Sequence, residues 1–347
     1  MKLTSVPENL AERLALWLNI APTPVSDTML GFMLARTVMV AVKLEIFEVL
    51  ADQPQTIAQV AAQCSTDVKA TRILLNTLVQ LGYAQLNQDQ YALSSLARKW
   101  LLKESKVSLR DKMLLQFLEW DFTEHYEDYL RTGEPLNYHY HMDSKQWETY
   151  QQGMRSMAEI SAWEIGRRTP VPAQATQMLD IGGAHGFYSI ELCQRYPRLQ
   201  STILELPDAI EHAQPILAEK NPNGRVRYQA GNALTDDLGE AQWDLVFMSS
   251  LAHHFDEEAN AELAKRVARA LRPGGYYIVQ DLIRTDRPKS GDHLGGLLNM
   301  YFAATSEAGT YSEPEIHQWQ KQASLVPQRS VWLRSIPRHA QIVAKKM

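Results

Sequence analysis

The N-terminal third of the chain carries apolar positions at helical spacing. Residues 1–20 mix charged with apolar side chains, which predicts a short amphipathic helix rather than a signal peptide or a membrane span. Between residues 28 and 50 the apolar positions recur with few charges, so this helix is too apolar all round to lie on a surface. We expect it to be buried, within the chain or between subunits.

Two further helices and a hairpin follow. Thr56 and Gln59 stand three residues apart, a capping-box pattern that opens a helix. Asp67 opens the next helix, which Gly82 ends. The expected elements are helices over residues 57–64 and 68–81 and hairpin strands over 83–86 and 90–93. Two helices followed by a hairpin are typical of a winged-helix module.

Residues 108–168 are expected to be helical and are dense in aromatic and methionine side chains. Most of these side chains would be core, but rigid rings and thioethers also pack well against a flat aromatic ligand. The run Tyr138–His141 alternates tyrosine with histidine, and with no carboxylate before Asp143 a solvated loop is favoured over a metal site. The candidates to line a ligand pocket are Trp120, Tyr150 and Met154, with Asn299 and Met300 from a later segment.

From Gln177 onward strands alternate with helices. Such alternation predicts a parallel sheet covered on both faces, with the ligand at the carboxyl ends of the strands. The expected strands cover residues 178–181, 202–206, 226–230, 245–248 and 276–282. The expected helices cover residues 188–195, 209–219, 257–270 and 292–304.

Composition limits the partners. The 347 residues carry a formal net charge of −5 with both signs interspersed, so no broad positive field is available for nucleic acid or a membrane surface. Cys64 and Cys193 are the two cysteines, too few for a disulfide framework or a zinc ligand set. We therefore expect a cytoplasmic protein that binds a small neutral or weakly acidic molecule, without a metal.

A glycine-rich segment stands where the first strand of the predicted sheet turns into a helix. It reads Asp180-Ile181-Gly182-Gly183-Ala184-His185-Gly186, and its small residues let backbone N–H groups approach a ligand closely. The glycine spacing does not match the G-x-G-x-x-G pattern of dinucleotide enzymes. The next strand ends at Glu205, whose carboxylate at that position can accept hydrogen bonds from both ribose hydroxyls of a nucleoside.

The fourth strand leads into Ser249 and then a pair of histidines, His253 and His254. A phenol with a pKa near 10 is a poor nucleophile at neutral pH, whereas an imidazole with a pKa near 6.5 can accept its proton. A histidine at the end of a strand, beside a nucleoside site, is therefore a candidate general base.

Taken in order, these motifs resemble the bacterial and plant small-molecule O-methyltransferases related to caffeate and acetylserotonin methyltransferases. The resemblance runs from about Met29 to Ala323, and Thr132–Pro135 and Leu297–Tyr301 echo family segments. It implies an α/β fold, with a Rossmann-like class I methyltransferase domain over residues 108–347, of which residues 108–170 are helical and line the substrate pocket. It also implies that residues 1–107 form a mainly helical winged-helix dimerisation domain, and hence a homodimer.

The same resemblance implies the cofactor S-adenosyl-L-methionine, with S-adenosyl-L-homocysteine as product. Ala184 replaces the middle glycine of the family's acidic-x-G-x-G-x-G loop, and Asn232 stands where the family has an aspartate that accepts from the adenine amino group. The cofactor-binding residues implied in this way are Asp180, Gly182, Gly183, Glu205, Leu206, Gly231, Asn232, Ala233 and Ser249.

In this resemblance His253 falls at the family's catalytic base and Asp281 at the carboxylate that orients it, while His254 as base stays open. The family's second carboxylate aligns close to Ala308, with Glu307 one place earlier, so the resemblance does not imply a two-carboxylate clamp and the second partner of the base stays open. The leading function is methyl transfer to a hydroxyl of an aromatic small molecule.

Two alternatives remain. The same fold and cofactor could serve methylation of carbon or nitrogen, or chemistry without methyl transfer. A winged-helix regulator that senses a metabolite is the second alternative, but it would need a basic recognition helix, and residues 68–81 carry only Lys69 and Arg72.

Overall fold

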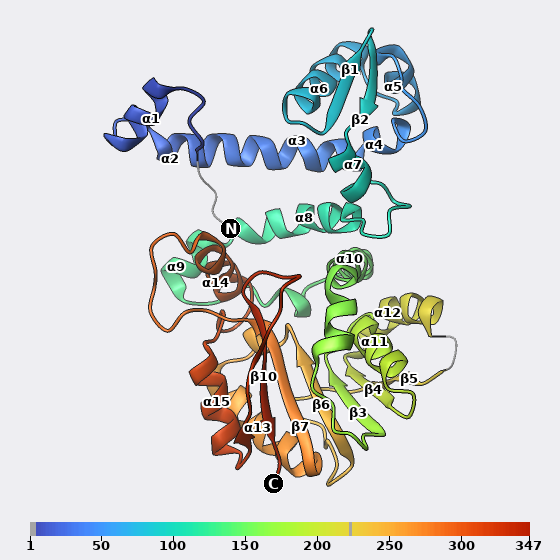
Figure 1. The fold of residues 1–347 in the computed structure, drawn as a ribbon, viewed down its shortest axis with the longest axis vertical. Helices are drawn as coiled ribbons and strands as arrows, with labels where there is room; N and C mark the ends of the chain where they lie inside the picture. Colours follow the sequence, from blue (N-terminus) through green and yellow to red (C-terminus); the bar gives the residue numbers. More distant parts are fainter. Residues whose placement is uncertain (1–4, 222–223) are drawn as a thin grey trace. The chain divides into compact units, whose positions relative to one another are not determined.

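The computed structural model describes residues 5–221 and 224–347 (Figure 1). The chain divides into two compact units, one ending at Phe117 and the other beginning at Leu118. This division lies inside helix α8 (Arg110–Thr123). The domain boundary expected between residues 107 and 108 stays a prediction.

The first unit is mainly helical and contains a two-stranded antiparallel hairpin. The capping box at Thr56 and Gln59 is confirmed, as is Asp67 as the N-cap of the next helix. Gly82 follows that helix with φ +78°, a conformation that glycine adopts without strain. The elements are α1 (Leu10–Trp17), α2 (Thr23–Val25), a π-helical turn (Ser26–Leu30), α3 (Gly31–Lys43), α4 (Ile46–Val49), α5 (Ile57–Gln63), α6 (Val68–Gln80), β1 (Ala84–Asn87), β2 (Gln90–Leu93) and α7 (Ser95–Trp100).

The expectation of one continuous apolar helix over residues 28–50 is wrong, whereas its burial between subunits stays a prediction. Glu45 adopts φ +59° and separates α3 from α4. Within one chain only the second half of α3 packs into the core, whereas Phe32 is 52% exposed and Met33 48% exposed. By length and composition alone, Thr23–Lys43 is apolar enough to cross a membrane.

The second unit is built on a twisted sheet in the order β5-β4-β3-β6-β7-β10-β8, with β9 also paired to β10 (Figure 1). The five strands from β5 to β7 in this order run parallel, so their carboxyl ends meet at one edge of the sheet. The strands are β3 (Gln177–Ile181), β4 (Gln200–Glu205), β5 (Val226–Ala230), β6 (Trp243–Ser249), β7 (Leu271–Leu282), β8 (Val326–Pro327), β9 (Val331–Trp332) and β10 (His339–Lys345).

Helices cover both faces of this sheet, as the alternating strands predict. Alternate residues of β6 belong to two different cores: Leu245 and Phe247 pack with α10 and α11, and Val246 and Met248 pack with α13 and α15. The helices are α9 (Tyr126–Thr132), α10 (Ser144–Arg168), α11 (Phe187–Arg195), α12 (Pro207–Lys220), α13 (Glu257–Ala270), α14 (His293–Thr305) and α15 (Glu313–Gln322).

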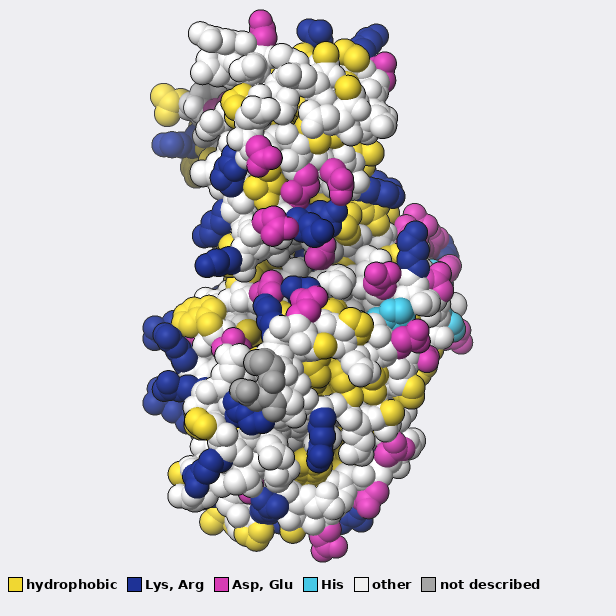
Figure 2. All heavy atoms as spheres, turned by 90° about the vertical axis from the view of Figure 1, so that its right-hand side faces the viewer, with side chains coloured by type: hydrophobic (Ala, Val, Ile, Leu, Met, Phe, Trp, Pro, Cys, Tyr) yellow, Lys and Arg dark blue, Asp and Glu magenta, His cyan; other side chains and the backbone are white. Residues whose placement is uncertain are grey.

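The C-terminal part of the sheet does not follow the expected parallel pattern. β10 pairs antiparallel with β7, and β8 and β9 pair antiparallel with β10. On the face of the molecule seen in Figure 2, acidic and basic side chains are interspersed rather than gathered by sign.

Candidate active site

The glycine loop joins the end of β3 to the start of α11 through strained backbone. Gly182 has φ +66°, and a Cβ there would lie 2.8 Å from Cδ2 of Leu251. A Cβ on Gly183 would lie 2.6 Å from the carboxyl of Asp180. Ala184 adopts φ +44°, a region that residues other than glycine seldom occupy. A Cβ on Gly186 (φ +77°) would lie 2.7 Å from Cδ1 of Leu217, so the loop needs glycine at three positions and holds its alanine under strain.

Asp180 lies beneath this loop, with only 1% of its surface exposed. Its Oδ2 accepts a hydrogen bond of 2.5 Å from the hydroxyl of Ser189, which also lies 2.7 Å from the Oγ of Ser201. Burial raises the pKa of Asp180 to about 7. In this position the carboxyl supports the loop from below, and its predicted contact with the cofactor stays a prediction.

Glu205 ends β4 at the same edge of the sheet and is half-buried. Its carboxylate accepts hydrogen bonds from the backbone N–H of Ala184 at 3.1 Å and of Leu206 at 2.8 Å. Burial raises the pKa of this carboxyl above its ordinary value, and the two N–H groups oppose that rise. The carboxylate thus connects the glycine loop to the neighbouring strand end.

The segment after β5 forms a turn around Asn232. The Oδ1 of Asn232 accepts from the N–H of Leu234 at 2.9 Å, and its own N–H donates to Asp236 at 2.9 Å. Gly231 is half-buried and Ala233 is buried. The asparagine side chain therefore organises this turn, and its role toward adenine stays a prediction.

His253 and Asp281 form a buried pair where β6 and β7 end. The Nδ1–H of His253 donates to both oxygens of Asp281, at 2.9 and 3.1 Å, and the two residues are 3% and 4% exposed. Burial alone would raise the pKa of Asp281, but the facing imidazole and the N–H of Leu282 hold it below its ordinary value. An ionised Asp281 keeps the proton on Nδ1 and leaves the Nε2 lone pair of His253 as the basic atom.

Ser249 lies beside this pair, since it is paired in register with Gln280, the residue before Asp281. The amide of Gln280 donates to the hydroxyl of Ser249 at 2.9 Å and accepts from Gln341 at 2.9 Å. The predicted site residues at the ends of β3, β4, β5, β6 and β7 therefore share one edge of the sheet.

Aromatic rings surround the imidazole of His253. Phe302 of α14 stacks on it, with ring centroids 3.8 Å apart and an angle of 26° between the planes. The ring centroid of His254 lies 4.2 Å from that of His253. The ring of His139 meets His254 edge-on, with ring centroids 4.5 Å apart. The His254 ring is held by a 2.7 Å hydrogen bond between Nδ1 and the Oγ of Ser306.

The expectation of a solvated loop at residues 138–141 is wrong for its first half. Tyr138 is 4% exposed and stacks on Phe122 at 4.6 Å. His139 packs against Trp147 and Tyr150, and burial lowers its pKa to about 3, with His253 adding to the effect. Among the described residues, no group of three or more potential metal ligands is close enough to hold a metal ion.

The predicted pocket residues have different surroundings. The ring of Tyr150 belongs to the aromatic cluster around His139, with its centroid 5.9 Å from that of Tyr138. The Oδ1 of Asn299 accepts from both the N–H and the hydroxyl of Thr310, at 2.9 and 2.7 Å, so it fastens α14 to the following loop. Three others are half-buried: Trp120 on α8, Met154 on α10 and Met300 on α14.

Sequence reasoning missed Phe302, Ser306 and His139 as neighbours of the base. Phe302 lies two residues after the predicted pocket residue Met300, and that proximity is the signal that could have found it. The contacts of His139 depend on how the segment between α9 and α10 folds back, for which the sequence carries no pattern.

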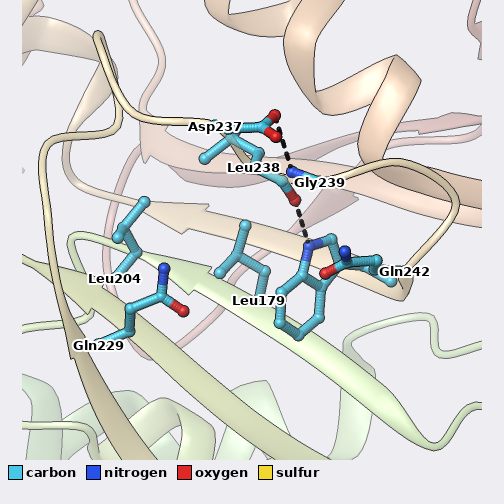
Figure 3. A pocket seen from close by; sticks show the side chains of 8 residues that line it. Leu179, Leu204, Gln229, Asp237, Leu238, Gly239 and Gln242 are labelled. Atoms are coloured by element: carbon cyan, nitrogen blue, oxygen red, sulfur yellow. Dashed lines mark hydrogen bonds between the residues drawn. The ribbon is translucent and has the colours of Figure 1, made fainter.

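A small cavity of about 140 Å³ lies elsewhere on the sheet (Figure 3). Its labelled side chains include Asp237, whose carboxylate accepts from the N–H of Gly239 at 3.1 Å, and the indole of Trp243 donates to the carbonyl of Leu238 at 2.9 Å. None of the predicted site residues lines it, so it is separate from the strand-end site.

Comparison with known proteins identifies the family. Residues 118–324 match the O-methyltransferase domain family, and residues 26–103 match the O-methyltransferase dimerisation domain family. The chain is a member of the O-methyltransferase family. This O-methyltransferase is 25% identical over 80% of its length to the human "Probable bifunctional dTTP/UTP pyrophosphatase/methyltransferase protein", of which it spans 47%. It is also 23% identical to the 3-hydroxy-5-methyl-1-naphthoate 3-O-methyltransferase of Streptomyces sahachiroi, over 89% of this chain and 91% of that one.

The fold of this O-methyltransferase matches solved structures closely. Human N-acetylserotonin methyltransferase, in complex with SAM, superposes with a TM-score of 0.83 at 18% identity, covering 99% of both chains. This similarity confirms the expected class: an α/β Rossmann-like methyltransferase domain preceded by a mainly helical region.

Proposed function

We propose that this protein transfers the methyl group of S-adenosyl-L-methionine to a hydroxyl of an aromatic small molecule and releases S-adenosyl-L-homocysteine. The observation that carries the proposal is the buried His253–Asp281 pair at the carboxyl edge of the parallel sheet. The family match over residues 118–324 supports the reaction class.

The residues at the strand ends suit this cofactor. The loop at Gly182 and Gly183 leaves no room for a Cβ, as expected where backbone must approach a ligand. Glu205 supplies a carboxylate for the ribose hydroxyls, and the turn from Gly231 to Ala233 would flank the adenine. When bound, the cofactor supplies an activated methyl group on a positively charged sulfur.

The chain's own chemistry is general base catalysis. Nε2 of His253 accepts the proton of the acceptor hydroxyl, and Asp281 stabilises the imidazolium that results. Base catalysis of this kind contributes about 10²- to 10⁴-fold. Phe302 covers one face of the imidazole and restricts its rotation, so the base keeps its direction.

An aromatic acceptor is favoured by the rings around the base. Tyr138, His139, Trp147 and Tyr150 form a cluster of apolar ring surfaces next to His254, and such surfaces suit a flat ring. The name of the S. sahachiroi relative, a hydroxynaphthoate methyltransferase, is consistent with this class of acceptor.

The first unit would serve to form a homodimer in the cytoplasm. Residues 26–103 match the family's dimerisation domain, and this range contains most of the apolar stretch Thr23–Lys43. Pairing of two chains through the exposed side chains Met29, Phe32 and Met33 would remove them from water. A formal net charge of −5, with both signs interspersed along the sequence, gives no broad positive field for nucleic acid.

The test is a methyl transfer assay with S-adenosyl-L-methionine labelled in its methyl group and a panel of hydroxylated naphthalenes. We expect the product to be a methyl ether, identified by mass spectrometry and by loss of the phenolic proton. Label found on a ring carbon or on nitrogen would contradict O-methylation and favour the same fold acting on another atom.

A further inference from the structure

Tyr228 of the edge strand β5 lies in one row with two residues beneath the glycine loop. In the registers of these parallel strands, Asp180 of β3 is opposite Ile203 of β4, which is opposite Tyr228. Side chains of residues paired in this way project from the same face of a sheet. The loop packs directly on this row, since a Cβ on Gly183 would lie 2.6 Å from the carboxyl of Asp180 and 3.0 Å from Cγ2 of Ile203. The strand register therefore brings a tyrosine under the loop.

The hydroxyl of Tyr228 holds the strained residue of this loop. It donates a 2.6 Å hydrogen bond to the carbonyl oxygen of Ala184. On the other side of the same Cα, the N–H of Ala184 donates to the carboxylate of Glu205 at 3.1 Å. One bond fixes the peptide unit before the Cα and the other fixes the peptide unit after it, so together they set both φ and ψ of Ala184.

Ala184 needs this support because its backbone conformation is unfavourable for alanine. At φ +44° the Cβ of an L-residue crowds the carbonyl oxygen that follows, a cost that glycine does not carry. Without the bond to its carbonyl, this residue would relax toward negative φ. The N–H of Ala184 would then turn away from Glu205, and the carboxylate that faces the ribose would lose one of the groups that orient it.

The tyrosine is suited to donate this bond at all neutral pH values. Its ring is half-buried and packs against the core on the α11 face of the sheet. Burial raises the pKa of Tyr228 above its ordinary value, and the charges of Glu205 and Asp180 add to the rise. The hydroxyl therefore keeps its proton and remains a donor.

We propose that Tyr228 is a positioning residue for cofactor binding, whose bond to Ala184 holds the alanine-bearing loop in the conformation that receives the adenosyl group. The proposal rests on the proposed function, since it takes the strand ends as the cofactor site. Ala184 adds strain to the loop and Tyr228 opposes it, so the two residues act as a pair. Tyr228 acts through the loop backbone and through the Glu205 carboxylate.

A double-mutant cycle on cofactor affinity tests this pair. Calorimetric titration of S-adenosyl-L-homocysteine into the full-length protein compares the wild type with Tyr228→Phe, which keeps the ring and removes only the hydroxyl. We expect the affinity to fall about two- to ten-fold, the range for one net hydrogen bond. In the Ala184→Gly background the same change should alter the affinity by less than about two-fold, because glycine adopts this φ without support.

Tyr276→Phe is the matched control. Tyr276 is half-buried against the same core, and its hydroxyl makes no hydrogen bond within the part of the chain that the structure describes. This variant should bind S-adenosyl-L-homocysteine as tightly as the wild type, and thermal unfolding without ligand shows that each variant is folded. A purely structural role of Tyr228 would lower the Tm and leave the affinity unchanged.

Three results would each overturn the proposal: unchanged affinity in Tyr228→Phe, an equal loss of affinity with and without Ala184→Gly, or no binding of S-adenosyl-L-homocysteine by the wild type. Failure of the proposed function gives a different result. In that case the coupling between Tyr228 and Ala184 persists in binding, while labelled methyl groups reach no hydroxyl of the naphthalene panel. Methyl transfer to a hydroxyl together with unchanged affinity in Tyr228→Phe would overturn the proposal and leave the proposed function intact.

Discussion

The hydroxyl of Ser189 on α11 donates a 2.5 Å hydrogen bond to Oδ2 of Asp180 on β3, while Oδ1 of the same carboxyl is buried and unpaired in the described chain. Burial raises the pKa of Asp180 to about 7, Ser189 opposes the rise, and the charge of Glu205 adds to it. A carboxyl that is partly protonated at neutral pH therefore lies directly beneath the glycine loop.

Replacing Asp180 by Asn should stabilise the protein at alkaline pH. Because the folded-state pKa is raised, the native protein binds more protons than the unfolded chain between about pH 4 and pH 7, and stability falls as the pH rises through that window. Asp180→Asn removes the buried charge, so its Tm above pH 7 should exceed that of the wild type. Thermal unfolding at pH 5 and pH 8 measures this, with exposed Asp208→Asn as control. If the Tm of Asp180→Asn changed between pH 5 and pH 8 as much as that of the wild type, the raised pKa of Asp180 would be contradicted.

Removal of the base should impair turnover and not cofactor binding. His253→Ala should lower kcat by about 10²- to 10⁴-fold, because the acceptor hydroxyl loses the group that takes its proton. Single-turnover methyl transfer measures the chemical step, and His141→Ala, an exposed histidine, is the matched control. If His254→Ala were instead the variant that loses the chemical step, the base would have to be reassigned.

Glu205 is expected to contribute to the affinity for the nucleoside. Glu205→Gln should weaken binding of S-adenosyl-L-homocysteine by about 1 to 3 kcal/mol, since ribose hydroxyls lose a charged acceptor. Calorimetry gives the Kd directly, and Glu211→Gln on the exposed side of α12 serves as control. Unchanged affinity would remove Glu205 from the site.

Glu164 on α10 stabilises the second unit by contacts with the segment before β10. Burial alone would raise its pKa, but hydrogen bonds from Ser335 and Arg168 and from the backbone of Arg334 lower it to about 2. Because the folded-state pKa is lowered, this stability is present above the unfolded value near 4.3 and is lost as the pH falls toward 2.

Glu164→Gln should therefore cost about 3 kcal/mol at pH 7 and should flatten the loss of stability in acid. Urea unfolding between pH 3 and pH 7 measures both effects. Glu148→Gln, exposed on the same helix, is the control. If the free energy of unfolding of Glu164→Gln fell as steeply between pH 7 and pH 3 as that of the wild type, another carboxylate would be the source of this stability.

The sequence predicts much of the methyltransferase domain because its signals are local. Alternating apolar strands and helices locate β3 to β7, and glycines at a strand end locate the loop at Gly182. The pairing of His253 with Asp281 is implied by the family resemblance. The parallel pairing of β6 with β7 brings the ends of the two strands together and is the physical reason the pair can form.

Other features depend on contacts that the local sequence does not encode. β8 and β9 are two residues long and form only against β10. Segments this short carry no alternation of apolar and polar residues from which a strand could be predicted. Tyr138 was expected in a solvated loop, because the burial of its ring depends on rings from α8 and α10 that lie elsewhere in the sequence. The exposed half of α3 reflects a surface that one chain alone does not cover.

The central claim is that the carboxyl ends of β3 to β7 bind an adenosyl cofactor beside His253. Calorimetric titration of S-adenosyl-L-homocysteine into the purified full-length protein tests it most directly. The account predicts saturable binding of one molecule per chain, weakened in Glu205→Gln and unchanged in His253→Ala. No saturable binding, or binding that Glu205→Gln and a bulky replacement of Gly183 leave unaffected, would contradict it.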